Sequence, residues 1–460
     1  MKKSNSSQKE CKALFIISAA LLLVYTFFIN HVDCNTIVTW GYDLLESVRY
    51  GSLEEFPVYT YKTHFMATNY TLISNIVNAL WLLPVYLMDK LFSIGFSIIV
   101  YDIWYKILIL LTAIGSLLFF SKILIKLKTP VDKKVIALYT MSTSSIVLIA
   151  VLGKGQIDMF DLFFVLSSMY AYLNNRVQLS FLFIGLGCLF KPFIILLGIP
   201  YLCLMIGRSG IRTLLNGLLL VLPYILDVTV TRVLMPRYGK MADITSEAFA
   251  DIFGKTRIEQ LFATKVNNVY IFFLLAIIVC GICIYIGIEN RTKEWHLIIF
   301  PTIMYSVFAF IVDATVLYWY VVIVPLLVLM GCSLRRPQDF LIINFVMNVL
   351  VPFLYVYMEE ELIPGRNYSV LDSISKTDDL YPFMENLSYF RYHIGVGTTV
   401  FLGCLLLLCI EYIYEKKTKS IQIGDNLAAG SGGEGNFIKG LLFIQALPAL
   451  LYAILVYVMY

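Results

Sequence analysis

The chain has 460 residues, of which 59% are hydrophobic and only 14% are charged, and its formal net charge is +4. Its apolar runs are long and continuous, so they can cross a bilayer as helices, whereas the strands of a membrane barrel would alternate apolar and polar residues. The sequence therefore predicts an all-α, polytopic membrane protein without a soluble domain. No basic tract is dense enough to indicate a nucleic-acid partner.

The first apolar run covers residues 13–30. It is too long for a removable signal peptide and no small-residue cleavage site follows it, so we expect a retained anchor. By the positive-inside rule, the lysines before it place the N-terminus in the cytoplasm. These are Lys2, Lys3, Lys9 and Lys12. The loop over residues 32–102 is then external.

The later part of this loop, residues 71–100, is apolar but interrupted by Pro84, Asp89, Lys90 and Gly95. We expect it to form amphipathic, interfacial or re-entrant helices on the outer surface rather than a full span. The next apolar run is then the second span. The lysine-rich connector after that run stays in the cytoplasm, as the positive-inside rule requires.

Twelve apolar runs follow this loop, which brings the predicted number of spans to about thirteen. The second to the last are expected near residues 103–120, 135–152, 159–174, 178–191, 193–207, 212–233, 268–288, 296–312, 315–333, 340–357, 394–414 and 438–459. Two more long loops, residues 234–267 and 359–393, lie outside under this topology. Residues 428–435 are rich in Gly and Ser and predict a flexible cytoplasmic tether. The nine cysteines have neither a disulfide framework nor metal-ligand spacing.

Two groups of polar residues lie at expected outer ends of spans. Asp33 directly follows the first span, and Asp43 lies farther along the same expected surface helix. Lys154, Gln156 and Asp158 form the junction of the third and fourth spans. A hydroxyl is a poor nucleophile until a carboxylate takes its proton, and amide and carboxylate groups can hold sugar hydroxyls. Either acid is a candidate base, and the alternative for all of them is a solvated loop or turn.

Several cations are candidates for binding a phosphate at the outer face. Lys154 is one, and Lys191, which precedes Pro192 at the next outer junction, is another, although Lys191 can instead extend to the lipid headgroups. Arg237 and Arg257 lie in an external loop with an unusual number of cations. That loop either grips lipid phosphate or forms a solvated amphipathic helix.

For the other polar and aromatic side chains in the external regions, we expect no role in binding or catalysis. Glu46 and Glu54 are expected to face solvent. Tyr318, Trp319 and Tyr320 lie at the outer end of a span, where an aromatic belt at the membrane surface is expected rather than a sugar platform.

The order of these motifs resembles the GT-C superfamily of integral membrane glycosyltransferases. The stretch from Asp33 to Asp43, with the aromatic residues 59–61 and Tyr70 after it, looks like the first external loop of that superfamily. Gly155-Gln156-Ile157-Asp158 is similar to the junction in bacterial and dolichol-dependent members, and Leu189-Phe190-Lys191-Pro192 to their Lys-Pro break. The resemblance covers residues 1–210, a catalytic module, and leaves 211–460 as a variable transmembrane module of the same domain.

The resemblance implies a GT-C fold and an inverting, mannosyltransferase-like enzyme. It would move a hexose from a polyprenyl-phosphate donor to a hydroxyl at the outer face, for envelope glycan assembly. Asp33 would be the base and Asp43 its alternate, with Gln156, Asp158, Lys154 and Lys191 as orienting or donor-binding residues. The alternatives are a transporter or flippase of lipid-linked saccharides, and an envelope polymerase or ligase that works through its late external loop.

No nucleotide-binding or metalloprotease motif occurs in the chain, so we expect no cofactor. The resemblance leaves a divalent metal open, as in the oligosaccharyl branch, but no ligand cluster supports one. The expected partners are the lipid-linked donor, a lipid-linked or envelope glycan acceptor and membrane lipids. Short loops and the lack of a retention signal favour a bacterial cell membrane, with the active site on its external face.

Overall fold

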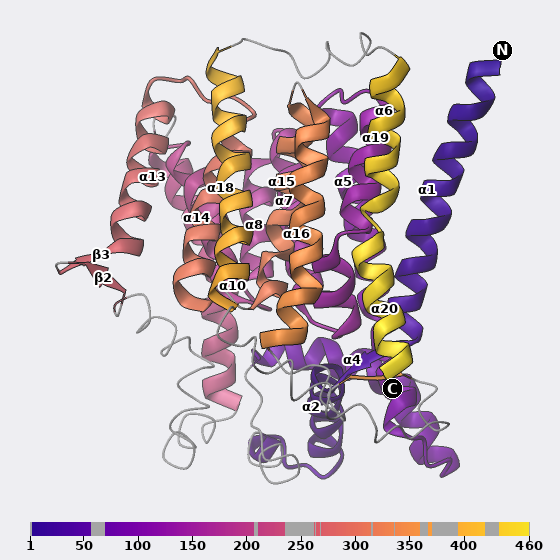
Figure 1. Ribbon diagram of the computed structural model, residues 1–460. Coiled ribbons are helices and arrows are strands. Elements are labelled where there is room, and N and C mark those ends of the chain that lie inside the picture. The colour runs from indigo at the N-terminus through magenta and orange to yellow at the C-terminus, as the bar shows by residue number, and fades with distance from the viewer. Residues whose placement is uncertain are drawn as a thin grey trace. The chain divides into compact units, whose positions relative to one another are not determined.

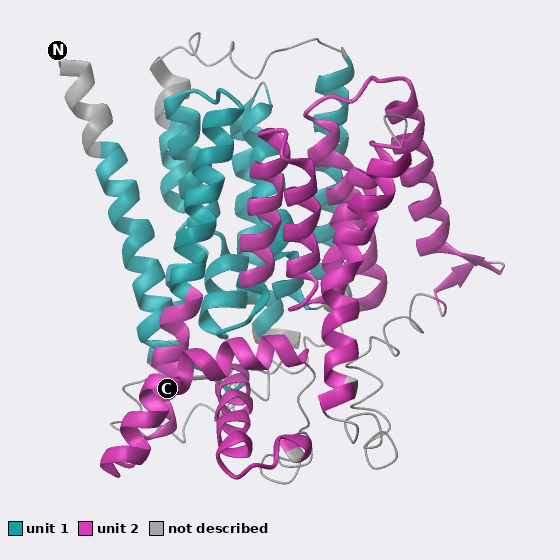
Figure 2. Ribbon diagram, turned by 180° about the vertical axis from the view of Figure 1, so that it is seen from behind, with its two compact units in different colours: residues 1–32, 110–159, 314–460 teal, residues 33–109, 160–313 magenta. Residues whose placement is uncertain are grey.

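The computed structural model describes residues 2–56, 70–206, 210–234, 262, 264–266, 268–313, 316–334, 336–358, 367–369, 394–418 and 432–459. Nearly all of its regular structure is helical (Figure 1). The chain divides into two compact units, each built from separated stretches of sequence (Figure 2). Unit 1 comprises residues 1–32, 110–159 and 314–460, and unit 2 comprises residues 33–109 and 160–313.

Unit 1 contains both ends of the chain. In it α1 packs against α6 and η2, η2 packs against η5, and α16 packs against α18, α19 and α20. Its elements are α1 (Lys2–Phe27), β1 (Ile29–His31), the later part of α5 (Ile98–Lys126), α6 (Val131–Ser142), η2 (Ile146–Gly153), η5 (Leu317–Ile323), α15 (Val324–Ser333), α16 (Pro337–Met358), β4 (Asn367–Ser369), α18 (Ile394–Thr418), α19 (Gly432–Ile444) and α20 (Leu447–Met459). The short strands β1 and β4 pair antiparallel, with Ile29 opposite Ser369.

Unit 2 contains α2 (Val32–Arg49), η1 (Leu53–Glu55), α4 (Leu72–Phe92), the first part of α5, α7 (Asp158–Leu173), α8 (Val177–Gly187), η3 (Pro192–Ile194), α9 (Ile195–Cys203), α10 (Gly210–Leu234), β2 (Lys265–Val266), β3 (Val269–Tyr270), α13 (Ile271–Ile288) and α14 (His296–Asp313). Its tightest helix contact is between α8 and α10. A Cβ at Gly185 of α8 would lie 2.5 Å from the carbonyl oxygen of Leu219 on α10. Small residues at such contacts are typical of helices packed in a membrane.

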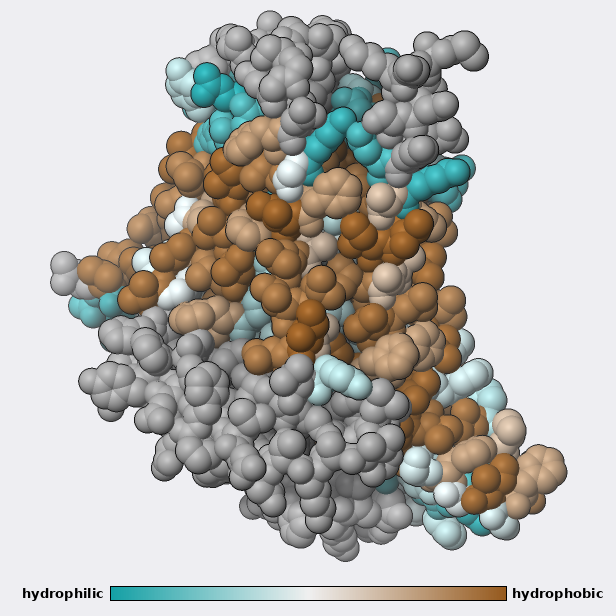
Figure 3. All heavy atoms as spheres, turned by 45° about the vertical axis from the view of Figure 1, so that its right-hand side comes forward, coloured by the Kyte–Doolittle hydropathy of each residue, from teal (hydrophilic) through white to brown (hydrophobic). Residues whose placement is uncertain are grey.

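The surface of the described helices is apolar over a wide area (Figure 3). Phe15, Leu214 and Ile277 each expose 70% or more of their area. Large exposed apolar surfaces are rare on water-soluble monomers and are expected where helices contact lipid. Among the described residues, nine helical segments are long and apolar enough to cross a membrane. The prediction of an all-α, multi-pass membrane protein is thereby confirmed.

Each of the thirteen predicted spans coincides with helix in the described part of the chain. Several are shorter or more irregular than predicted. The last one is divided into α19 and α20 at Gln445, whose amide nitrogen donates to the carbonyl oxygens of Leu341 (2.9 Å) and Leu441 (3.0 Å). The start of the predicted Gly/Ser tether lies outside the described residues, but its end, from Gly432, belongs to α19. The number of crossings, and the module boundary near residue 210, stay predictions.

The apolar stretch over residues 71–100 differs from its prediction. Interruptions were predicted at Pro84, Asp89, Lys90 and Gly95, but α4 runs continuously through the first three and is capped by Ser93, which has a left-handed φ of 51°. Proline costs a helix one hydrogen bond, and eight further residues of apolar helix outweigh that loss here. By length and composition α4 is itself a candidate span. In Figure 1 it lies crosswise to α10 of the same unit, the orientation expected of an interfacial helix.

Candidate active site

The helix α2 of unit 2 carries both predicted acids. Asp33 lies in its first turn and is partly exposed, whereas Asp43 is only 3% exposed. The first-turn position suits Asp33 because the positive end of the helix dipole stabilises a carboxylate there. The structure therefore gives the two acids different surroundings on one element.

The two acids cannot act on the same atom through one fixed helix. They are ten residues apart in α2, and at 1.5 Å per residue this corresponds to about 15 Å along the axis. Trp40 lies between them, seven residues after Asp33 and therefore on nearly the same helix face. Only one of the two acids can therefore be the general base of a single reaction centre, and the other acid has a different role.

The face of α2 around Trp40 is connected to the predicted Lys-Pro junction. The rings of Trp40 and Tyr70 pack edge to face with centroids 5.3 Å apart, and Lys191 Nζ lies 4.8 Å from the centroid of Tyr70. The hydroxyl of Thr71 donates to the carbonyl oxygen of Leu189. Lys191 is 8% exposed. Because it is buried against Tyr70, it does not extend to the headgroups, and the cation is held beside the acid-bearing helix.

Two buried ionisable residues near Asp33 were missed by the sequence analysis. Asp102 and Lys106 of α5 are 0% and 1% exposed and lie one helical turn apart. Both act on the buried thiol of Cys34, whose pKa lies well above its ordinary value mainly because the thiol is buried. The charges of Asp102 and Asp33 raise this pKa further, and the charge of Lys106 lowers it. A carboxylate and an ammonium at this spacing in an apolar run are costly to bury and usually functional. That spacing is the signal that would have found them.

The prediction that Glu46 faces solvent is wrong, whereas Glu54 is exposed as expected. Glu46 is 5% exposed, and one of its oxygens lies 2.9 Å from Lys90 Nζ and accepts a 2.9 Å hydrogen bond from the Tyr86 hydroxyl. Lys90 also lies 5.2 Å from the ring centroid of Tyr42. These contacts attach the C-terminal half of α2 to α4.

Partial burial raises the pKa of Glu46, but the hydrogen bonds from Lys90 and Tyr86 outweigh it and hold the pKa below its ordinary 4.5. The ion pair therefore contributes fully to the free energy of unfolding above the ordinary pKa of a glutamate. This contribution is lost as the pH falls through the lowered pKa of Glu46 in the folded protein. We expect Glu46→Gln to lower the free energy of unfolding by about 2 kcal/mol at neutral pH. The difference from wild type should disappear as the pH falls through the lowered pKa of Glu46, as thermal unfolding in micelles would measure.

The matched control is an ion pair at the surface of unit 1. Lys439 Nζ lies 2.9 Å from a carboxylate oxygen of Glu10, and the two side chains are 48% and 33% exposed. Glu10→Gln is expected to change stability by less than about 0.5 kcal/mol. Equal losses for Glu46→Gln and Glu10→Gln would contradict the assignment of Glu46 as a buried anchor of α2.

The third-to-fourth span junction lies in unit 1 and is fully buried. It follows η2, an eight-residue π-helix, a form often found at functional sites. Gly155 has a φ of +64°, and the N–H of Gln156 donates to the carbonyl oxygen of Val151 over 2.9 Å. This turn ends η2 and leads into α7. Gln156 is 3% and Asp158 2% exposed, so the solvated-turn alternative does not describe them.

Lys154 of the same junction lies among aromatic rings. It is 2% exposed, and its Nζ lies 4.4 Å from the ring centroid of Tyr355 and 5.9 Å from that of Tyr318. Trp319 and Tyr320 are 1% and 0% exposed. They are packed inside unit 1 and do not form the aromatic belt that was expected at the membrane surface. Cation–π contacts can hold an ammonium group in place while leaving its charge available to an anion.

Arg237 and Arg257 lie outside the described residues, as do the aromatic residues 59–61 and most of the loop 359–393. Within the part of the chain that the structure describes, no group of three or more His, Cys, Asp or Glu side chains is placed to hold a metal ion. The structure thus arranges the other predicted residues in two clusters. Unit 2 contains Asp33, Asp43 and Lys191, where Tyr70 and Trp40 connect Lys191 to α2, and unit 1 contains Lys154, Gln156 and Asp158.

Comparison of the chain with protein-family models, with curated proteins and with solved structures finds no match in any of the three.

Proposed function

We propose that the protein is a GT-C-type glycosyltransferase that moves a sugar, a hexose by preference, from a polyprenyl-phosphate donor to a hydroxyl acceptor at the outer face of the membrane. The observation that carries the proposal is in unit 2. A helix with two acids packs through Trp40 and Tyr70 against the buried cation of Lys191. A carboxylate and a fixed cation are the two charges that this transfer requires.

The proposed reaction is a single displacement. The carboxylate of Asp33, or of Asp43 as its alternate, takes the proton of the acceptor hydroxyl as that oxygen forms a bond to the anomeric carbon. The bond between this carbon and the phosphate oxygen breaks, and polyprenyl phosphate leaves with its electron pair. Lys191, and in unit 1 Lys154, are the cations proposed to neutralise the phosphate. Attack opposite the leaving group inverts the anomeric configuration.

The acceptor is a lipid-linked saccharide or an envelope glycan, and Gln156 and Asp158 hold or orient its hydroxyls. The protein is proposed to lie in a bacterial cell membrane with its N-terminus in the cytoplasm, since the lysines in the first part of α1 favour that side. No bound cofactor enters this reaction, because the lipid carrier already activates the sugar.

One observation favours the second candidate, an envelope polymerase or ligase. Strand β4 comes from the late external loop and pairs with β1, whose last residue, His31, stands two positions before Asp33. A polymerase would use such a late segment, paired with the strand that precedes the acid-bearing helix in the sequence. It would join whole saccharide units rather than transfer one hexose.

The test follows both halves of the donor. Protein reconstituted in vesicles is given a polyprenyl-phosphate hexose labelled in the sugar and, separately, in the lipid, together with a membrane glycolipid extract. A transferase releases labelled polyprenyl phosphate in step with labelled product of inverted configuration. Movement of intact donor across the bilayer would instead identify a flippase. Product that grows by whole repeat units would identify a polymerase.

A further inference from the structure

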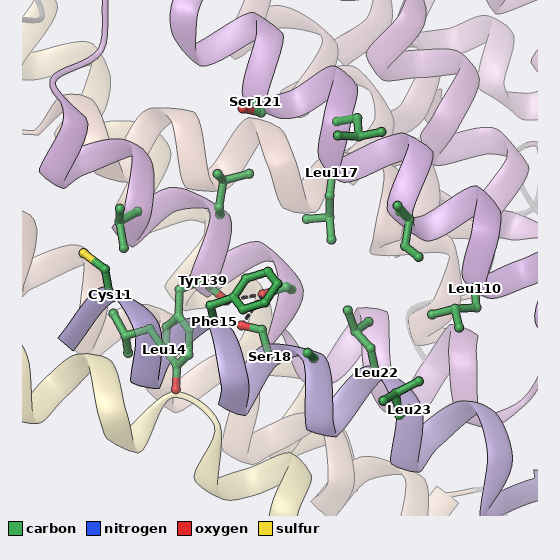
Figure 4. A pocket seen from close by; sticks show the side chains of 16 residues that line it. Cys11, Leu14, Phe15, Ser18, Leu22, Leu23, Leu110, Leu117, Ser121 and Tyr139 are labelled. Carbon is green, nitrogen blue, oxygen red and sulfur yellow. Dashed lines mark hydrogen bonds between the residues drawn. The ribbon is translucent and has the colours of Figure 1, made fainter. Parts of the chain in front are cut away.

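Unit 1 contains a cavity of about 620 Å³ between α1, α5 and α6 (Figure 4). Its volume lies within the range of small-molecule sites. Leucine side chains make up much of its wall and no charged residue lines it. Two of its polar groups satisfy each other, because the Ser142 hydroxyl donates to that of Ser18 over 2.9 Å. Such a wall can accept a hydrocarbon chain.

The cavity runs lengthwise between the helices. Cys11 and Ser121 mark one of its ends in Figure 4, and Leu23 and Leu110 mark the other. Cys11 and Leu23 are twelve residues apart on α1, which corresponds to about 18 Å. This length and direction match a lipid chain that lies along the bilayer normal.

Lysines gather at the Cys11 end of the cavity. Each of the three helices carries one directly next to a lining residue. Lys12 follows Cys11, Lys122 follows Ser121 and Lys134 precedes Val135. The hydrogen bond between Ser18 of α1 and Ser142 of α6 fixes the register of these two helices. Cys11 comes seven residues before Ser18 and Val135 seven residues before Ser142, so Val135 lies at the Cys11 end. Glu10, the acid beside this end on α1, is already engaged by Lys439.

We propose that this cavity binds one anionic phospholipid, with an acyl chain between α1, α5 and α6 and its phosphate at Lys12, Lys122 and Lys134. Basic groups at the cytoplasmic mouth of an interhelical pocket are suited to acidic headgroups. The proposed sugar donor is not the occupant. Its sugar has to meet the acceptor at Asp33, which follows the other end of α1. The inference does not rest on the proposed transferase activity.

The test counts lipids that stay on the protein. The protein is incubated with vesicles of phosphatidylcholine containing phosphatidylglycerol, and the retained lipid is identified by native mass spectrometry. Wild type is expected to retain one phosphatidylglycerol in preference to phosphatidylcholine. Replacing Lys12, Lys122 and Lys134 by Gln should lower that retention at least tenfold, since each lysine near an anionic lipid contributes roughly a fivefold effect.

A second variant tests the cavity without changing charge. Ala19→Phe places a ring among the lining side chains and should displace the lipid although all three lysines remain. The control removes three other lysines, Lys126, Lys128 and Lys417, and should retain the lipid as wild type does. Equal retention by all variants, equal retention of phosphatidylcholine, or displacement of the lipid by polyprenyl phosphate would each overturn the proposal.

Discussion

Asp33→Asn is expected to lower the rate of sugar transfer roughly a thousandfold, because a general base contributes about 10² to 10⁴ to a reaction of this kind. An amide has nearly the same shape and cannot take the proton of the acceptor hydroxyl. Asp33 is partly exposed in the first turn of α2, so an acceptor can reach it. The measurement is the initial rate of labelled product formation by equal amounts of inserted protein.

Asp43→Asn is the matched comparison. About 15 Å of helix separates the two acids, so only one of them should give a loss of this size. If Asp33 is the base, Asp43→Asn should retain most of the rate and change stability instead, because Asp43 is buried. The reverse pattern would make Asp43 the base. Similar small losses from both would remove α2 from the chemistry.

Lys154→Met should raise the donor KM by about 30-fold, as expected when a charge-assisted bond of about 2 kcal/mol to a phosphate is lost. The side chain is 2% exposed and held beside Tyr355, so a cation of fixed position is removed and a similar volume remains. The rate at saturating donor should fall much less. The experiment is a donor titration of wild type and variant.

The control for this prediction is Lys126→Met, which removes an exposed lysine at the end of α5 in the same unit. It should leave the donor KM unchanged. An equal rise in KM for Lys126→Met would mean that lysines act through the general surface charge. An unchanged KM for Lys154→Met would exclude Lys154 from donor binding.

The membrane class and the helical segments could be predicted from the sequence because apolar runs are long, continuous and separated by charged connectors. The path of the chain within a run was harder to predict. Pro84 did not end α4, since the apolar residues on both sides of it favour helix, and the break came at Ser93. Likewise, Gln445 divides the last run by binding the carbonyl groups of Leu341 and Leu441, which no local pattern reveals.

The candidate site was predicted only in part, because burial depends on contacts between distant segments. Glu46 was expected in solvent, yet Lys90 and Tyr86 of α4 enclose it. The sequence allows two positions for the Lys191 side chain, and the ring of Tyr70 beside it selects the buried one. Asp102 and Lys106 carried a signal of their own, since their spacing places both charges on one face of an apolar helix.

The most direct test of the central claim is whether purified protein breaks the donor. Wild-type protein in vesicles is given polyprenyl-phosphate hexose labelled in the sugar. A double variant that carries both Asp33→Asn and Asp43→Asn is treated in parallel. We expect labelled acceptor product from wild type, with a matching amount of released polyprenyl phosphate, and none above background from the double variant. Intact donor throughout, or equal product from both proteins, would contradict the central claim.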